Sequence, residues 1–202
     1  MLRVGITGGI GTGKTTVCRL FEYLGVPVYA ADLAAKRLMR EDPALIKRVQ
    51  DAFGPESYLN GEPNRPFLAQ SVFGNPQKLE LLNSLVHPAV FQDFEHWCSL
   101  QKDAPYVIKE AAIMFESGSY KQVHTVVVVA APLELRLQRV KERDGLADED
   151  ILKRIASQMP QETLISRADA VILNDGSHSL IKQVIQLHQR FLNTAGATQE
   201  IL

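Results

Sequence analysis

Residues 8–15 read Gly8-Gly9-Ile10-Gly11-Thr12-Gly13-Lys14-Thr15, close to the start of the chain. This run matches G-x-x-x-x-G-K-[ST], the pattern of a phosphate-binding P-loop. Glycines allow successive backbone N–H groups to turn inward around phosphate oxygens, where a Cβ would obstruct them. Lys14 would carry a positive charge to the β- and γ-phosphates, and the Thr15 hydroxyl would ligate Mg²⁺. The run therefore predicts a nucleoside triphosphate site on residues 8–16.

The sequence on either side of the loop favours this interpretation over a glycine-rich turn that fits by chance. Residues 2–6 form a short apolar run that suits a buried strand. From Val17 onward, apolar residues recur at i, i+3, i+4 and i+7, which is typical of an amphipathic helix, and Gly25 would end it. A strand, a glycine-rich loop and a helix are the expected context of a P-loop.

The composition is that of an ordinary globular protein. The chain has 202 residues, of which 46% are hydrophobic, and its 22 basic and 23 acidic residues give a net charge of −1. This balance indicates neither a nucleic-acid footprint nor a polybasic membrane patch. Two cysteines make a disulfide framework improbable, and we expect Cys18 to be a core residue.

The chain shows no targeting or membrane signal in its sequence. The first predicted strand begins at Leu2, which leaves no room for a signal peptide, and the longest apolar run, residues 126–131, is too short to span a bilayer. We therefore expect a cytoplasmic protein that binds small molecules and neither nucleic acid nor membrane. We expect it to be a monomer or a weak homo-oligomer.

Predicted strands alternate with helices along the chain. Residues 125–129 are β-branched without polar alternation, as in a parallel strand covered on both faces. The pattern predicts the α/β class, a P-loop NTPase parallel sheet with helices on both faces and ligands at the carboxyl ends of its strands. The other predicted strands are 26–29, 105–108 and 170–173, and the predicted later helices are 132–143, 149–158 (with Asp148 as its cap) and 179–192.

A long helical insertion separates the second and third strands. It is too long for a simple crossover and is a candidate acceptor-binding domain. Its predicted helices are 33–40, 43–53, 67–73, 76–86 and 88–101, with a turn-rich loop at 54–66. We predict a nucleotide-binding core of residues 1–32, 104–137 and 159–202, an acceptor-binding insertion of 33–103 and a lid of 138–158.

Two carboxylates are candidates for the chemistry. Asp32 follows the second predicted strand, at the carboxyl edge of the sheet, where it could accept a proton from an attacking hydroxyl or help hold Mg²⁺. It also suits the N-cap of the helix that follows. Glu110 follows the third strand and could orient a Mg²⁺-bound water, or be an ordinary polar residue at a strand end.

Arginines of the predicted lid are candidates for neutralising transferred charge. Arg139 and Arg143 lie four residues apart, on one helix face, and Arg154 lies on the next helix. Arginines that close over a phosphoryl group stabilise its charge and exclude water. The alternative is a solvated face on which Glu142 and Asp144 pair with them.

Two residues of the insertion are candidates for binding an acceptor. His87, next to Pro88, would open a helix, although a lone histidine is more often structural. Arg65, in the predicted loop, could pair with an anionic acceptor or be solvated.

A GTPase switch is not favoured, because the N-K-x-D pattern is absent and the D-x-x-G match at residues 51–54 ends a predicted helix.

These residues resemble the dephospho-CoA kinase family over nearly the whole chain. Residues 7–15 look like that family's T-G-G-I-G-[ST]-G-K-[ST], and residues 28–32 resemble V-[IF]-D-A-D. The last aspartate of the second motif, which is regarded as the catalytic base in the family, corresponds to Asp32. The first aspartate is replaced by Ala30, which places more of the expected chemistry on Asp32.

Further blocks follow in the family's order. Residues 65–75 look like R-x-x-L-x-x-x-V-F-x-[ND], and residues 82–88 look like L-N-x-[IL]-x-H-P. Gln138, Arg139 and Arg143-Asp144 loosely resemble the lid pattern Q-x-x-R-x-x-x-R-D. The remaining matches are 112–116 with P-L-L-[FV]-E, 154–158 with R-I-x-x-Q, and 168–176 with A-D-x-V-I-x-N-x-G, a segment that borders the adenine in this fold.

The resemblance implies an ATP:dephospho-CoA 3′-phosphotransferase, the last enzyme of coenzyme A synthesis, using ATP and Mg²⁺. The sequence alone leaves open another small P-loop kinase acting on a metabolite or nucleoside monophosphate, or a regulator that binds ATP without transferring phosphate. The expected catalytic residues are Lys14, Asp32, Arg139 and Arg143. Substrate is expected on Asp32, Arg65, His87 and Glu116, and Mg²⁺ on Thr15 and Glu110. ATP is expected on Gly8, Gly9, Gly11, Thr12, Gly13, Lys14, Thr15, Thr16, Asn174 and Gly176.

Overall fold

The structure of the protein, a computed structural model, describes residues 1–199. The chain divides into two compact units, each described by itself below. Met1–Ala30 and Gln101–Leu202 form one of them, here called the sheet unit. Ala31–Leu100 form the other, here called the helical unit.

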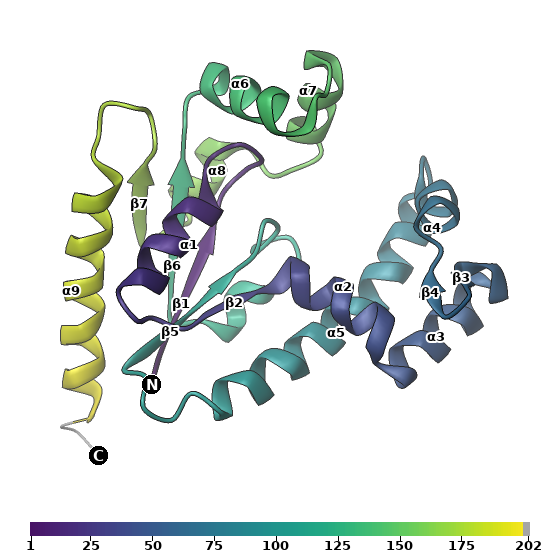
Figure 1. The fold of residues 1–202 in the computed structure, drawn as a ribbon, viewed down its shortest axis with the longest axis horizontal. Helices are drawn as coiled ribbons and strands as arrows, with labels where there is room; N and C mark the ends of the chain where they lie inside the picture. Colours follow the sequence, from purple (N-terminus) through teal and green to yellow (C-terminus); the bar gives the residue numbers. More distant parts are fainter. Residues whose placement is uncertain (200–202) are drawn as a thin grey trace. The chain divides into compact units, whose positions relative to one another are not determined.

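The sheet unit is built on five strands that all run parallel. They lie in the order β2-β5-β1-β6-β7 (Figure 1). In the register, Ile6 of β1 lies opposite Glu110 of β5 on one side and Val127 of β6 on the other. This arrangement confirms the predicted α/β fold with a parallel sheet. The strands are β1 (Leu2–Thr7), β2 (Val28–Ala30), β5 (Tyr106–Glu110), β6 (Thr125–Ala130) and β7 (Ala170–Leu173).

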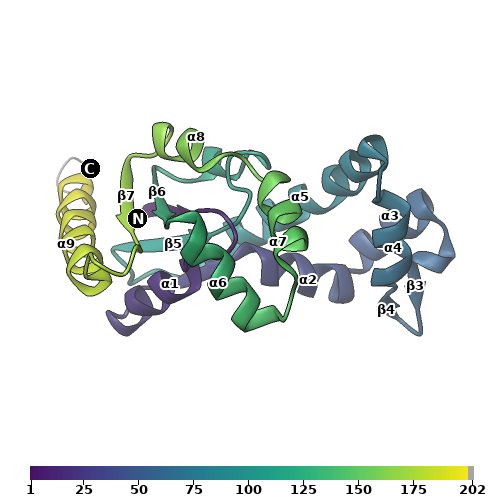
Figure 2. The same ribbon diagram turned by 90° about the horizontal axis from the view of Figure 1, so that it is seen from above.

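Helices cover both faces of this sheet (Figures 1 and 2). On one face, α1 (Lys14–Tyr23) and α9 (Leu180–Gln199) pack against each other and against the strands. On the other face, the short helix α8 (Gln161–Ser166) packs beside β6. The first face holds the main core, which joins residues of all four longer strands to the two helices: Val4, Ile6, Val17, Cys18, Phe21, Val26, Tyr106, Ile108, Val127, Val129, Ile172, Val184 and Phe191.

The helical unit begins its helices with polar caps and prolines. The side chains of Asp42, Asn64 and Asn75 each accept a backbone N–H in the first turn of the helix that they precede. A proline follows each cap within two residues, where its missing N–H costs nothing. The elements are α2 (Ala31–Glu41), α3 (Pro43–Phe53), η1 (Pro55–Ser57), β3 (Tyr58–Leu59), β4 (Glu62–Pro63), α4 (Arg65–Val72) and α5 (Pro76–Ser99).

Two polar contacts fix α2 within the helical unit. The Arg37 guanidinium donates to both carboxylate oxygens of Asp93 on α5, each at 2.7 Å. The hydroxyl of Tyr58 donates to the backbone carbonyl of Met39 at 2.7 Å. These contacts connect α2 to α5 and to β3 within the unit.

The structure corrects four local predictions. Pro88 does not open a helix; it lies inside the continuous helix α5. Arg65 is the first residue of α4 and not part of a loop. Helix α7 (Asp148–Ala156) begins at Asp148 and has Ala147 at its cap position, so Asp148 is not the cap. Asp32 is likewise the second residue of α2, inside its first turn.

The remaining elements of the sheet unit are η2 (Ser119–Gln122) and α6 (Leu133–Asp144). Cys18 and Cys98 are free and buried, so the prediction that Cys18 is a core residue is confirmed. Within the described part of the chain, no helix is both long enough and apolar enough to cross a bilayer.

Candidate active site

The P-loop connects the carboxyl end of β1 to the first residue of α1. Gly11 and Gly13 have φ angles of 80° and 92°, in the left-handed region that favours glycine. A Cβ at Gly13 would collide with the side-chain nitrogen of Asn174. The backbone conformation and the close neighbour together explain why this position has to be glycine.

The loop is braced by its own side chains. The Lys14 ammonium donates to the carbonyl oxygens of Gly8 at 2.8 Å and Gly9 at 3.4 Å, so its charge lies over the loop. The buried hydroxyl of Thr12 donates to the same Gly9 carbonyl at 2.9 Å. Thr15 and Thr16 are exposed in the first turn of α1, where unpaired N–H groups and the helix dipole favour an anion.

Arginines of α6 hold the loop from one side. The Nε of Arg136 donates to the Ile10 carbonyl at 2.9 Å, and Arg139 donates to the Gly11 carbonyl at 3.4 Å. Arg136 is only 6% exposed, and burial lowers the pKa of its guanidinium, although the charge of Glu162 opposes that shift. Even so, a guanidinium remains charged at neutral pH.

The sequence reasoning missed Arg136, although a signal for it was present. In the family pattern Q-x-x-R-x-x-x-R-D, the first arginine stands three residues after the glutamine. Arg136 stands three residues before Arg139, so Arg136 and not Gln138 occupies the glutamine's place. Gln138 instead donates to Glu142 on the exposed side of the same helix.

Asn174 and Gln158 hold the loop from two further segments. Asn174, directly after β7, donates its side-chain amide to the Thr12 carbonyl at 2.8 Å. Arg139 donates to the side-chain and backbone oxygens of Asn174 at 3.3 and 3.1 Å. The side-chain oxygen of Gln158 accepts the Ile10 N–H at 2.8 Å. Four side chains from distant parts of the sequence thus fix the loop backbone.

Gly176 lies in the turn after Asn174, with a φ of 86°. Asp175 fixes this turn by accepting the backbone N–H groups of Ser177 and His178 at 2.9 and 3.0 Å. These hydrogen bonds, first among them those from His178, hold the pKa of Asp175 well below its usual range. Asn174 and Gly176 therefore belong to one ordered segment beside the loop.

The predicted carboxylates of the sheet unit lie at the carboxyl edge of the sheet or just beyond it. Glu110 is the last residue of β5, not the residue after it. The pKa of the Cys18 thiol is raised mainly by burial and secondly by the negative charge of Glu110. This carboxylate therefore lies within electrostatic reach of α1. Glu116 accepts the backbone N–H of Met159 at 3.0 Å.

The two predicted lid arginines have different surroundings. Arg139 contacts the loop, as described above. Arg143 donates to both carboxylate oxygens of Asp144, at 2.7 and 2.8 Å, and this contact raises the pKa of Arg143. Arg154 approaches the same carboxylate at 4.0 Å. Arg143 thus pairs with Asp144, the alternative considered from the sequence, while Arg139 contacts the P-loop and Asn174.

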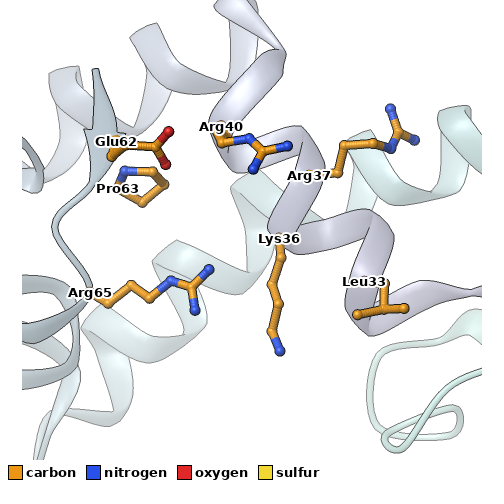
Figure 3. A pocket seen from close by; sticks show the side chains of 7 residues that line it. All are labelled: Leu33, Lys36, Arg37, Arg40, Glu62, Pro63 and Arg65. Atoms are coloured by element: carbon orange, nitrogen blue, oxygen red, sulfur yellow. The ribbon is translucent and has the colours of Figure 1, made fainter. Parts of the chain in front are cut away.

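The helical unit carries the other predicted substrate residues. Asp32 and Arg65 are exposed, and His87 is half-buried, with its ring stacked over that of Phe91 at 6.3 Å between centroids. Arg65 lines a cavity of about 190 Å³ (Figure 3), and neither Asp32 nor His87 does. The cavity residues are Leu33, Lys36, Arg37, Arg40, Glu62, Pro63 and Arg65.

Comparison with known proteins identifies the family. The family model described as "Dephospho-CoA kinase" matches residues 2–179. A protein of Bacteroides fragilis named dephospho-CoA kinase is 40% identical over 186 residues, which are 92% of this chain and 91% of that protein. The resemblance recognised from the sequence motifs is therefore confirmed.

Solved structures agree with the fold. A crystal structure from Thermus thermophilus has a TM-score of 0.84 and 35% identity and covers 94% of this chain and 96% of its own. Dephospho-CoA kinase from Campylobacter jejuni has a TM-score of 0.70 at 24% identity, covering 95% and 98%, and shows the same fold. With a family model over nearly its whole length and a relative of high coverage, the chain belongs to the dephospho-CoA kinase family.

Proposed function

We propose that this chain transfers the γ-phosphoryl group of ATP to the ribose 3′-hydroxyl of 3′-dephospho-CoA, giving coenzyme A and ADP. The observation that carries the proposal is a fully braced P-loop at the start of α1, with Lys14 over it, in a member of the dephospho-CoA kinase family. Bracing of this kind fixes the loop backbone before ATP arrives, and preorganised groups stabilise developing charge.

The proposed chemistry assigns a role to each group. The 3′-oxygen of the acceptor attacks the γ-phosphorus, the bond to the β–γ bridging oxygen breaks, and ADP leaves. Asp32 orients the hydroxyl and takes its proton. Lys14 and Arg139 neutralise charge on the moving group, and Arg143 would join them by exchanging the Asp144 carboxylate for a phosphate oxygen. The exposure of Asp32 supports this role, because its carboxylate is open to an acceptor.

The residues of the sheet unit fit Mg²⁺. Hydroxyl and carboxylate oxygens are its preferred ligands, and Thr15 and Glu110 supply one of each near α1. The described residues contain no group of three or more His, Cys, Asp or Glu that could hold a metal. When bound, Mg²⁺ would neutralise phosphate charge.

Location and assembly belong to the same proposal. We propose a cytoplasmic enzyme that acts as a monomer or a weak homo-oligomer. Two free, buried thiols support a reducing compartment. Light scattering of the purified protein measures its oligomeric state directly.

The test is a coupled assay of ADP release. Mg-ATP is supplied with dephospho-CoA as acceptor, and with AMP and pantetheine phosphate as controls. We expect ADP release that depends on dephospho-CoA, with coenzyme A as product. Turnover with another acceptor but not with dephospho-CoA would overturn the proposed substrate and leave a P-loop kinase.

A further inference from the structure

The cavity of the helical unit is unusually basic. Four of its seven lining residues are cations, namely Lys36, Arg37, Arg40 and Arg65, and one is the anion Glu62. The cavity is formed by α2, the β4 strand and the start of α4, all within this one unit. Like charges gathered around one hollow favour an anionic ligand.

Two of these cations already have acidic partners. Arg37 pairs with Asp93 and Arg40 pairs with Glu41. Figure 3 shows the side chains of Lys36, Arg40 and Arg65 around the hollow, whereas the Arg37 guanidinium extends away from them. Among residues 1–199, neither Lys36 nor Arg65 has an acidic partner within ion-pair distance.

The size of the cavity limits what it can hold. Sites that enclose a whole drug-sized ligand are typically about 300–1,000 Å³. A cavity of about 190 Å³ is smaller and suits one polar group of a larger molecule. With two cations that lack acidic partners, that group is most simply an anion carrying two charges, such as a diphosphate diester.

Asp32 lies on the same helix, α2, as Lys36 and Arg40, which line the cavity. Residues 32, 36 and 40 follow one another at intervals of four along α2, so they lie along one side of the helix. Each interval is a rise of about 6 Å at 1.5 Å per residue. In a nucleotide, the ribose ring and one methylene separate the 3′-oxygen from the 5′-phosphate, a span similar to one helical turn.

We propose that this cavity binds the 5′-diphosphate of the acceptor through Lys36 and Arg65, with Arg40 at its edge, while the ribose 3′-hydroxyl lies at Asp32. This inference rests on the proposed function and adds to it the site that recognises the acceptor's anionic linkage. The ligand class is a nucleoside 5′-diphosphate ester with a free 3′-hydroxyl. The spacing between Asp32 and the cavity along α2 would then select acceptors whose 3′-hydroxyl and 5′-diphosphate lie the same distance apart.

The experiment removes each cation without adding bulk. Lys36→Gln, Arg65→Gln and the double variant are compared with Lys78→Gln, which removes an exposed lysine of α5 that does not line the cavity. All three positions are exposed, so the variants should fold, and thermal unfolding checks this. Steady-state kinetics give KM for dephospho-CoA, KM for ATP and kcat, and adenosine is measured as a competitive inhibitor against dephospho-CoA.

We expect each single variant to raise KM for dephospho-CoA by about ten- to a hundredfold, the effect of losing a charge-assisted hydrogen bond. KM for ATP and the inhibition constant of adenosine, which lacks the diphosphate, should stay within about twofold, as should every constant of Lys78→Gln. A rise in KM for ATP instead would assign the cavity to the phosphates of ATP and overturn the inference.

The outcomes separate this inference from the function on which it rests. Normal turnover of dephospho-CoA by the wild-type protein, with an unchanged KM for dephospho-CoA in all three cavity variants, would overturn the cavity assignment alone. An equal loss of adenosine and dephospho-CoA binding would also overturn it, because that would indicate a general change in α2. Wild-type protein that forms no coenzyme A would overturn the proposed function, and the cavity assignment would fall with it.

Discussion

Lys14 and Asp32 are the single residues on which the proposed chemistry depends most. Lys14→Ala removes the charge over the P-loop, and Asp32→Asn keeps the shape of the side chain while removing its basicity. We expect kcat to fall by at least about a hundredfold in each, the loss typical of a group that acts in the transition state. Steady-state kinetics with dephospho-CoA and Mg-ATP measure this.

Both positions allow a clear control for folding. Asp32 is exposed, and the Lys14 ammonium donates to backbone oxygens of its own loop, so the circular dichroism of both variants should match that of the wild type. A near-normal kcat for Asp32→Asn would remove Asp32 from the chemistry. The same result for Lys14→Ala would leave the loop as a binding site only.

Arg136 donates to the P-loop backbone, and under the proposed function it would act as a positioning residue for ATP. Arg136→Met removes the donor to the Ile10 carbonyl and leaves that oxygen without its partner. We expect the free energy of unfolding to fall by about 1–3 kcal/mol, the cost of an unsatisfied buried group. We also expect KM for ATP to rise by about tenfold, more than kcat falls, because the loop loses its bracing.

Arg154→Met is the matched control for Arg136. Its side chain is 55% exposed and lies 4.0 Å from the Asp144 carboxylate, so its loss should change stability by less than about 0.5 kcal/mol. Guanidinium unfolding and ATP titration compare the two variants. Equal effects from both would show that Arg136 contributes no more than a surface charge.

Within helix α5, Pro88 occupies a position where proline is energetically unfavourable. It lies at an exposed position inside α5, where proline lacks the N–H for the helical hydrogen bond and crowds the carbonyl one turn earlier. Pro88→Ala should therefore raise the free energy of unfolding by about 1–2 kcal/mol, after allowing for the more flexible unfolded chain. Thermal or guanidinium unfolding measures the gain.

Pro88→Ala also tests whether the proline positions the neighbouring His87. If the variant is more stable but its KM for dephospho-CoA rises, the proline positions that side chain at a cost in stability. If the free energy of unfolding falls instead, packing around α5 already compensates for the cost of a proline inside the helix. Replacing another exposed α5 residue, Ser84→Ala, provides the control for a change of surface on the same helix.

The elements that could be predicted from the sequence are those whose cause is local. The P-loop and α1 follow from eight consecutive residues, and β6 follows from its run of β-branched side chains. The residues missed are those whose role depends on distant partners. The spacing of the lid pattern marks the position of Arg136, but its partner Ile10 lies 126 positions away, and the spacing says nothing of that contact.

Errors at helix boundaries have the same origin. Pro88 is normally a helix breaker, but α5 continues through it because apolar residues on both sides, such as Val86 and Phe94, are buried in the helical unit. The short helix α8 was not predicted, since six residues carry little periodicity and Leu164 gains its burial from the sheet. Tertiary packing overrides local preference in both cases.

At the scale of the whole molecule, two buried acids should make folding sensitive to high pH. Burial raises the pKa of the Cys18 thiol above its ordinary value of 9.0, and burial likewise raises the pKa of the Tyr106 phenol above 10.0. Both side chains belong to the main core of the sheet unit. In the unfolded chain they would lose their protons at ordinary pH values, so above these values the unfolded state binds fewer protons than the folded state.

Stability should therefore be independent of these groups below about pH 9 and fall as the pH rises beyond it. Between pH 8 and about pH 10.5 we expect the free energy of unfolding to drop by about 2–3 kcal/mol, summed over the two groups. Guanidinium unfolding followed by circular dichroism measures the drop. The double variant Cys18→Ala/Tyr106→Phe should show a smaller fall in the free energy of unfolding with pH, although both changes lower stability at pH 8. The control Tyr23→Phe changes a side chain that is 86% exposed and should leave the pH dependence unchanged. If the double variant kept the full drop, the alkaline sensitivity would lie outside this core, and burial of its thiol and phenol would have no thermodynamic consequence.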